Sequence, residues 1–289
     1  SLHDALPISI IGVNIMMAVS DFDDLLQIAL DEKIDVAIIG AGLFLKNPED
    51  LGSTHTKFVP KVSSARAAKL IFQYWSDKFN KVPDAIVTEG PLCGGHIGFS
   101  RKEIQNPANT LLSIVQATAE VIKPFEQKYG REIPVISGGG VYTGAQMYDI
   151  IQGGAKAVKM GTRFVTTHEC DVSDAFKQNY LNCTKDDITI VDSPVGLPGR
   201  VITNDFVKDI QAGKQKPVNC PWKCLRTCDY KKVAFCIAEA LFSAASGDFD
   251  NGFSFAGSNA YLATEIISVK ETIERIKQEY AQRAMEFAV

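Results

Sequence analysis

The chain has 289 residues, of which 46% are hydrophobic and 22% charged, and its formal net charge is −4. This composition suits a soluble globular protein with a sizeable core. It gives no reason to expect a nucleic acid or an anionic membrane as partner, and no apolar run reaches the roughly 18 residues of a membrane span. Seven cysteines, an odd number in a chain this long, favour a reducing compartment, so the expected location is the cytoplasm.

The first nine residues have no structural pattern. "SLHDALPI" resembles the translation of a common sequencing-adapter oligonucleotide. We therefore interpret residues 1–9 as a non-native leader, and expect the native sequence to join near Ser9 or Ile10 with its true N-terminus missing. The alternative is a genuine disordered leader.

From Ile10 onward, short apolar runs alternate with longer amphipathic stretches. Strands are expected within 10–16, 35–42, 57–64, 84–90, 133–140 and 155–165. Helices are expected over 21–33, 65–79 and 143–154, and from Asn106-Pro107, as cap and first turn, to about Lys128. Nearly continuous apolar strands alternating with helices are typical of a parallel sheet covered on both faces.

An open doubly wound sheet and a (β/α)8 barrel both fit this α/β alternation. Every expected strand ends in polar or glycine-rich sequence, as at the C-terminal rim of a barrel, where functional groups collect. Six strands before Val165 would make a TIM barrel that lacks its first two strands, in agreement with a missing N-terminus. We therefore predict an N-terminally truncated (β/α)8 barrel.

The pattern changes after Val165. Residues 166–230 are richer in Asp, Asn, Pro and Cys, and "SPVGLPGR" (193–200) is expected to be an irregular loop. We assign 10–185 to the barrel, 186–230 to a small inserted lid, and 231–289 to helices that complete the barrel. Within the last part, helices are expected over 231–245 and 267–287, with a loop over 250–260.

Two glycine-rich turns follow the last two expected strands. "VISGGGVYTGAQ" and "VKMGTRF" place free backbone N–H groups at strand ends that lead into helices, which is the arrangement of a phosphate site. The candidate phosphate-binding residues are Gly138, Gly139, Gly140, Gly161 and Thr162. The alternative is a pair of tight turns without a ligand. No GxGxxG opens a first βα unit, so a Rossmann site is not supported.

A third glycine-rich stretch, "EGPLCGGHIGF" (89–99), surrounds His96. Glycines on both sides allow the backbone to lie close to a flat ligand, so His96 is a candidate general base or hydrogen-bond donor. A structural role for His96 is the alternative, and a Cys93–His96 nucleophile is a minor one. Asn14 interrupts an apolar strand, and its amide needs partners such as a ring edge or a neighbouring loop.

Four cysteines, Cys220, Cys224, Cys228 and Cys236, are spaced C-x3-C-x3-C-x7-C. On a helix, three of these thiols would lie toward one face, where a zinc ion or an iron–sulfur cluster could bind. The common metal spacing is C-x2-C, however. Free thiols that pack as small hydrophobic groups are the alternative, and the sequence leaves the choice open.

With "GVNIM", "EGPLCGGHIGF", "VISGGGV" and "VKMGTRF" in this order, the chain resembles the nitronate monooxygenase family, formerly called 2-nitropropane dioxygenase. That family shares its fold and flavin site with the flavin-dependent enoyl-acyl-carrier-protein reductases. The resemblance runs from Ile10 to the C-terminus and includes "NGFSFAGSNA". It implies a barrel that binds FMN non-covalently, with Gly138–Gly140, Gly161 and Thr162 at the phosphate, Asn14 and Gly95 along the ring, and His96 as catalytic base or proton partner.

The activity implied by the resemblance is oxidation of alkyl nitronates with O2 to a carbonyl compound and nitrite. The first alternative is an NAD(P)H-dependent enoyl-acyl-carrier-protein reductase acting on an enoyl thioester, and the second is a phosphate-binding barrel enzyme without flavin.

The chain departs from the family pattern in two ways. The first two barrel strands, with an early flavin contact, are absent, so a poorly flavinated or unstable chain is expected. The cysteine-rich segment is not part of the family pattern. The oligomeric state, including a possible homodimer, is left open.

Overall fold

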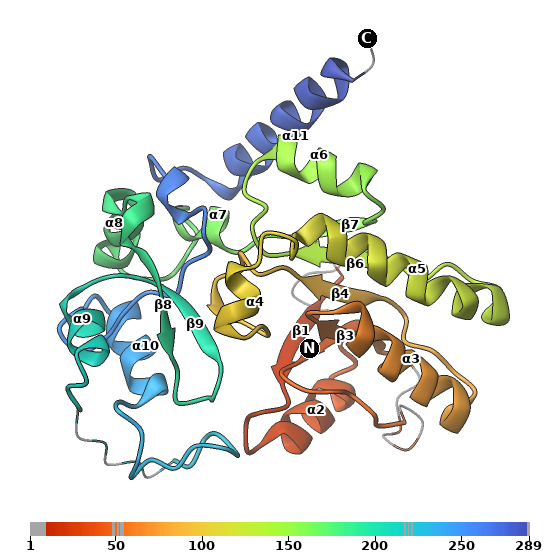
Figure 1. The fold of residues 1–289 in the computed structure, drawn as a ribbon, viewed down its shortest axis with the longest axis horizontal. Coiled ribbons are helices and arrows are strands. Elements are labelled where there is room, and N and C mark those ends of the chain that lie inside the picture. Colours follow the sequence, from red (N-terminus) through yellow and green to blue (C-terminus); the bar gives the residue numbers. More distant parts are fainter. Residues whose placement is uncertain are drawn as a thin grey trace.

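The computed structural model describes residues 10–47, 50, 52, 55–216, 218, 220 and 222–287. The leader predicted at 1–9 lies outside the described residues. The central sheet has six parallel strands: β1 (Gly12–Met16), β2 (Val36–Gly40), β3 (Lys57–Val62), β4 (Ile86–Glu89), β6 (Val135–Gly138) and β7 (Ala157–Lys159). Their spatial order is β1-β2-β3-β4-β6-β7, so each strand lies beside its predecessor in this sheet and the sheet curls like part of a barrel wall (Figure 1).

Helices connect these strands and pack against the sheet (Figure 1): α2 (Phe22–Asp31), α3 (Ala65–Phe79), α5 (Leu111–Tyr129) and α6 (Gly144–Gln152). α3 begins and ends as predicted, because Ser64 caps its first turn and Asn80 ends it in the left-handed conformation. The core below the sheet is aromatic: the rings of Phe44 and Phe58 stack at 5.6 Å beside Trp75. This packing holds the strand ends that carry the candidate site.

The expected start of the long helix at Asn106-Pro107 was wrong. Asn106 instead ends the short helix α4 (Arg101–Gln105), and its side chain accepts a hydrogen bond from the N–H of Ala108 at 3.0 Å. α5 begins at Leu111, where Thr110 and Ser113 cap each other reciprocally. Asn106 and Thr110 can both cap a helix and stand four residues apart in the sequence. The side chain of Asn106 bonds within a local turn, so Thr110 caps α5.

A second, antiparallel sheet contains β5 (Gly95–His96), β9 (Pro198–Ile202) and β8 (Ile188–Asp192), in that order. The irregular loop predicted over 193–200 is therefore confirmed for 193–197, where Gly196, with φ +85°, lies in the hairpin turn, and wrong for its last three residues, which belong to β9. α8 (Asp174–Asn182), α9 (Asp205–Gln211) and α10 (Ile237–Ala245) lie around this sheet (Figure 1). These elements form a second body beside the parallel sheet, and β5 joins the two.

Two other elements were predicted too long. β7 ends at Lys159, because Gly161 leads into the short helix α7 (Thr162–Val165). The helix predicted from residue 231 begins at Ile237. The C-terminal helix α11 (Val269–Glu286) was predicted within two residues and packs along α6 (Figure 1). No helix in the described part of the chain is long and apolar enough to cross a membrane.

Candidate functional site

A cavity of about 370 Å³ lies at the C-terminal ends of β4, β6 and β7. Six of the eight residues predicted for the site line it: Gly95, Gly138, Gly139, Gly140, Gly161 and Thr162. Cys93, the minor nucleophile candidate, also lines it, and further lining residues that were not predicted for the site include Glu89, Lys159, Tyr180, Phe255, Ala256 and Gly257. The tertiary structure therefore brings the three glycine-rich stretches to one place.

The turn after β6 can be built only from glycine. Gly139 and Gly140 have φ values of +94° and +96°, which side chains rarely adopt. A Cβ on Gly139 would lie 2.9 Å from the Cβ of Cys93, and one on Gly140 would lie 2.8 Å from the Cβ of Leu92. The Gly90–Gly95 loop thus packs directly on this turn, which accounts for these two glycines without any ligand.

The second turn is different. Gly161 has an ordinary φ of −119°, and a Cβ there would meet no heavy atom within 4 Å. Neither packing nor backbone strain accounts for glycine at this position. Because Gly161 lines the cavity, the missing side chain leaves room for something that occupies the cavity.

The backbone of both turns is suited to an anion. Within the described ranges, the N–H groups of Gly139, Gly140, Gly161 and Thr162 donate no hydrogen bond. The nearby buried hydroxyl of Ser258 also lacks a partner there. The residues that carry these N–H groups are half-buried or, at Gly161, exposed, so a group with several acceptor oxygens, such as a phosphate, can reach them and fits this cradle.

His96 lies on β5, directly after the lining residue Gly95. Its Nε2 is 2.7 Å from the Oγ of Ser193, and its ring meets Phe255 edge to face at 4.9 Å. Burial lowers the pKa of His96 to about 4, and the charge of Lys61 acts in the same direction. His96 is therefore neutral near pH 7, and Ser193 and Phe255 orient it. Neither partner was predicted from the sequence, although "NGFSFAG" carries Phe255.

This lowered pKa has a consequence for stability. Since the ordinary pKa of His96 is 6.5 and its folded value is about 4, the unfolded chain binds more protons between these pH values. We expect the free energy of unfolding to be retained above pH 6.5 and to fall as the pH drops toward 4. In His96→Gln the decrease in the free energy of unfolding at low pH should be smaller. His168→Gln changes an exposed histidine and should behave as wild type. Urea unfolding at pH 7 and pH 5 measures the difference, and equal pH dependence of both variants would contradict it.

Charged side chains at the rim were not predicted. The Nζ of Lys61, on β3, lies 3.0 and 3.1 Å from the two carboxylate oxygens of Glu89, at the end of β4. Burial lowers the pKa of Lys159, and Lys61 lowers it further. Burial, followed by the charge of Glu89, raises the pKa of Cys93 to about 12. A thiol that stays protonated is a poor nucleophile, so the Cys93–His96 alternative loses support.

Asn14 lies apart from this cavity. It is on β1, at the edge of the sheet opposite β7, and its side chain is exposed rather than buried as expected. It pairs through the backbone with Ile38 of β2. The contact of Asn14 with a flavin ring stays a prediction.

The four clustered cysteines line one small pocket of about 20 Å³. The described residues of this segment before α10 are not helical, so the alternative of thiols on one helix face does not apply. Among the residues that the structure describes, no three His, Cys, Asp or Glu side chains are placed to hold a metal ion. Burial raises the pKa of Cys224 and Cys228, and the neighbouring thiols add to it.

A curled parallel sheet with an anion cradle at the C-terminal ends of its strands defines a barrel-type α/β enzyme. The profile described as nitronate monooxygenase matches residues 2–279. The chain therefore belongs to the nitronate monooxygenase family, a family of oxidoreductases.

Similar proteins include a curated relative from Mycobacterium tuberculosis (strain ATCC 25618 / H37Rv), named (3aS,4S,5R,7aS)-5-hydroxy-7a-methyl-1-oxo-octahydro-1H-indene-4-carboxyl-CoA dehydrogenase. It is 28% identical over 206 residues, which are 71% of this chain and 51% of the relative. A "Probable nitronate monooxygenase" from Staphylococcus aureus (strain JH9) is 28% identical over 63% of this chain and 46% of its own length. The chain thus spans about half the length of these curated relatives.

Among solved structures, FabK from Thermotoga maritima is similar to this chain with a TM-score of 0.75 and 28% sequence identity. The match covers 96% of this chain and 78% of that one. The described fold is therefore similar to that of FabK over most of both chains.

Proposed function

We propose that the protein binds FMN and oxidises alkyl nitronates with O2 to a carbonyl compound and nitrite. The observation that carries this proposal is the convergence of the two glycine turns and Gly95, next to His96, around one cavity. The family membership of the chain agrees with it. The small-molecule substrate, the cytoplasmic location and a homodimer remain predictions.

The residues present fit FMN. Unpaired N–H groups of Gly139, Gly140, Gly161 and Thr162 would bind the phosphate, with Gly138 beneath them. The open space at Gly161 leaves room for it. The bare backbone at Gly95, with φ +73°, would lie along the ring. When bound, FMN supplies the electron acceptor for the carbanion-like nitronate and a route to O2.

The protein's own contribution centres on His96. As a neutral imidazole, His96 can take the α-proton of a neutral nitroalkane or hydrogen-bond a nitronate oxygen. Ser193 and Phe255 fix the orientation of the ring. A preformed nitronate has already lost its proton, so it needs only the binding role. Lys159 lines the cavity and places positive charge there, where it favours anionic substrates, whereas the charge of Lys61 is balanced by Glu89.

A second candidate function is reduction of an enoyl thioester with NAD(P)H. Its support is the likeness to FabK, an enoyl-acyl-carrier-protein reductase, over 96% of this chain. The named substrate of the M. tuberculosis relative is also a CoA thioester. Both functions would use the same cradle and His96, so the fold does not distinguish them.

An anaerobic spectrum of the purified protein with FMN separates these functions. We expect visible flavin bands that persist with NADH and bleach on addition of a nitronate. Bleaching by NADH, followed by reoxidation with an enoyl thioester, would replace the first proposal with the second. A protein that stays colourless after incubation with FMN would overturn both and favour a flavin-free phosphate-binding enzyme.

A further inference from the structure

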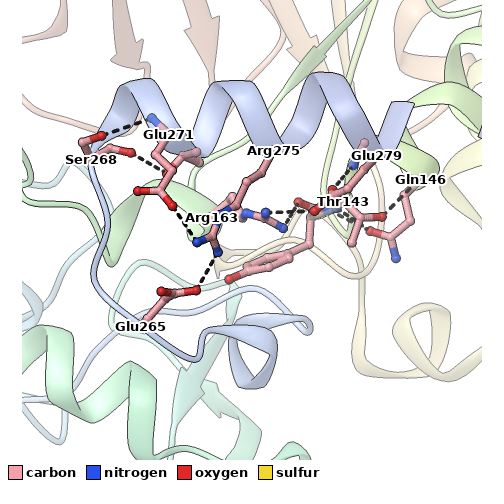
Figure 2. Close-up of polar contacts among 11 residues, drawn as sticks. Thr143, Gln146, Arg163, Glu265, Ser268, Glu271, Arg275 and Glu279 are labelled. Carbon is pink, nitrogen blue, oxygen red and sulfur yellow. Dashed lines mark hydrogen bonds and ion pairs between the residues drawn. The ribbon is translucent and has the colours of Figure 1, made fainter. Parts of the chain in front are cut away.

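The C-terminal helix α11 crosses the start of α6 and reaches α7 (Figure 2). These two helices follow the two glycine turns of the cavity. Gly140 stands four residues before Gly144, the first residue of α6, and Gly161 stands two residues before Arg163, in α7. A side chain on α11 that contacts both helix starts would therefore connect the two turns.

Glu279 is such a side chain (Figure 2). Its Oε2 accepts a hydrogen bond from the backbone N–H of Gly144 at 2.6 Å, and its Oε1 lies 3.1 Å from Nη2 of Arg163. Arg163 is only 11% exposed and Glu279 is 32% exposed, so water screens this pair less than a surface pair. One carboxylate thus holds the start of α6 and the start of α7 at the same time.

Arg163 completes the connection. Its Nη1 donates to the carbonyl oxygen of Tyr142 at 3.2 Å, and its guanidinium lies 4.7 Å from the centre of the Tyr142 ring. Tyr142 is two residues after Gly140 and is buried. The side chain of Arg163 therefore reaches from the second turn back to the first, independently of Glu279.

The helices also touch at their backbones. A Cβ on Gly144 would lie 1.9 Å from the carbonyl oxygen of Ile276, on α11, so the two helices pack backbone to backbone at a point where only glycine fits. Close packing of this kind makes α11 a rigid support for Glu279. The backbone at Glu279 is therefore held close to the start of α6.

Glu279 also occupies one of the backbone N–H groups that a ligand could otherwise bind. In the first turn of α6, the Gly144 N–H is bonded to Glu279 and the Gln146 N–H to the Oγ1 of Thr143. The donors on the two glycine turns remain, and they can bind one phosphate together only at a fixed separation. Since Arg163 and Glu279 neutralise each other, the pair contributes geometry and little net charge.

We propose that Arg163 and Glu279 are a positioning pair that sets the distance between the two glycine turns and thereby the affinity of the site for the cofactor's phosphate. This inference rests on the proposed FMN function. Neither side chain lines the cavity, so they act through the backbone of the turns.

The test compares FMN with riboflavin, which lacks the phosphate, by quenching of flavin fluorescence. Glu279→Ala removes both contacts, and Glu279→Gln keeps an acceptor for Gly144 but loses the ion pair. The matched control is Arg283→Gln, which breaks the 3.0 Å ion pair of Arg283 with Asp149 between the same two helices. We expect E279A to raise the Kd of FMN by roughly tenfold or more, E279Q to give a smaller rise, and R283Q to leave it unchanged.

The Kd of riboflavin should be unchanged in all three variants. Equal weakening of FMN and riboflavin, or an FMN affinity in E279A equal to that of R283Q, would overturn the proposal. If the unmodified protein binds no FMN, the proposed function fails and hydrogen exchange tests the pair by itself. E279A should then speed exchange within 139–144 and 161–165 relative to R283Q, and equal rates would overturn the positioning role.

Discussion

Replacing His96 by asparagine is expected to lower turnover of a neutral nitroalkane by about 10²- to 10⁴-fold, the usual contribution of a general base. Asparagine can still hydrogen-bond Ser193, but it cannot accept the α-proton. Because the pKa of His96 is about 4, the neutral base is available over the whole range above about pH 5. The His96-dependent rate should therefore be nearly flat from pH 5 to 8. Nitrite release, followed against pH, measures it.

Two comparisons make this result specific. A preformed nitronate has no α-proton to lose, so H96N should slow its oxidation much less than that of the nitroalkane. His168→Asn changes an exposed histidine away from the cavity and should have wild-type rates. If H96N slowed both substrates equally, His96 would act in binding only, and if it slowed neither, His96 would have no catalytic role.

The second large effect is expected at Gly161. Gly161→Leu should weaken FMN binding by at least about a hundredfold, because its side chain would extend into the space that the phosphate needs. Folding should be little affected: φ at this position is −119°, a Cβ meets nothing within 4 Å, and substitutions without new clashes usually change stability by less than about 0.5 kcal/mol. Equilibrium dialysis with FMN and a thermal melt give the two values.

Gly161→Ala and Gly139→Ala are the matched variants for this test. Gly161→Ala should weaken FMN binding only slightly, because one methyl group fills little of the cavity. Gly139→Ala should lower the melting temperature, because its φ is +94° and its Cβ would lie 2.9 Å from that of Cys93. A Gly161→Leu protein that binds FMN as wild type does would place the phosphate elsewhere.

The sequence by itself was sufficient wherever one local signal acted alone. Helix α3 was predicted over 65–79 from its sequence pattern, and the structure has those bounds, with Ser64 and Asn80 as its caps. The six parallel strands were predicted from their apolar runs, and their chain order became their spatial order. The glycine turns were found because glycine at a strand end is a local signal. At the start of α5 the local signal misled: Asn106 was predicted as the cap, and Thr110 caps the helix in the structure.

Only the tertiary structure decided which distant side chains meet. His96 bonds Ser193 across 97 positions, Lys61 pairs with Glu89 across 28, and Gly144 with Glu279 across 135. Strand β5 has two residues and exists because β9 pairs with it. Periodicity reports which face of an element is buried, but it carries no information on which element lies opposite. The orientation of His96 and the spacing of the glycine turns depend on such contacts, and so they followed from the packing of the whole chain.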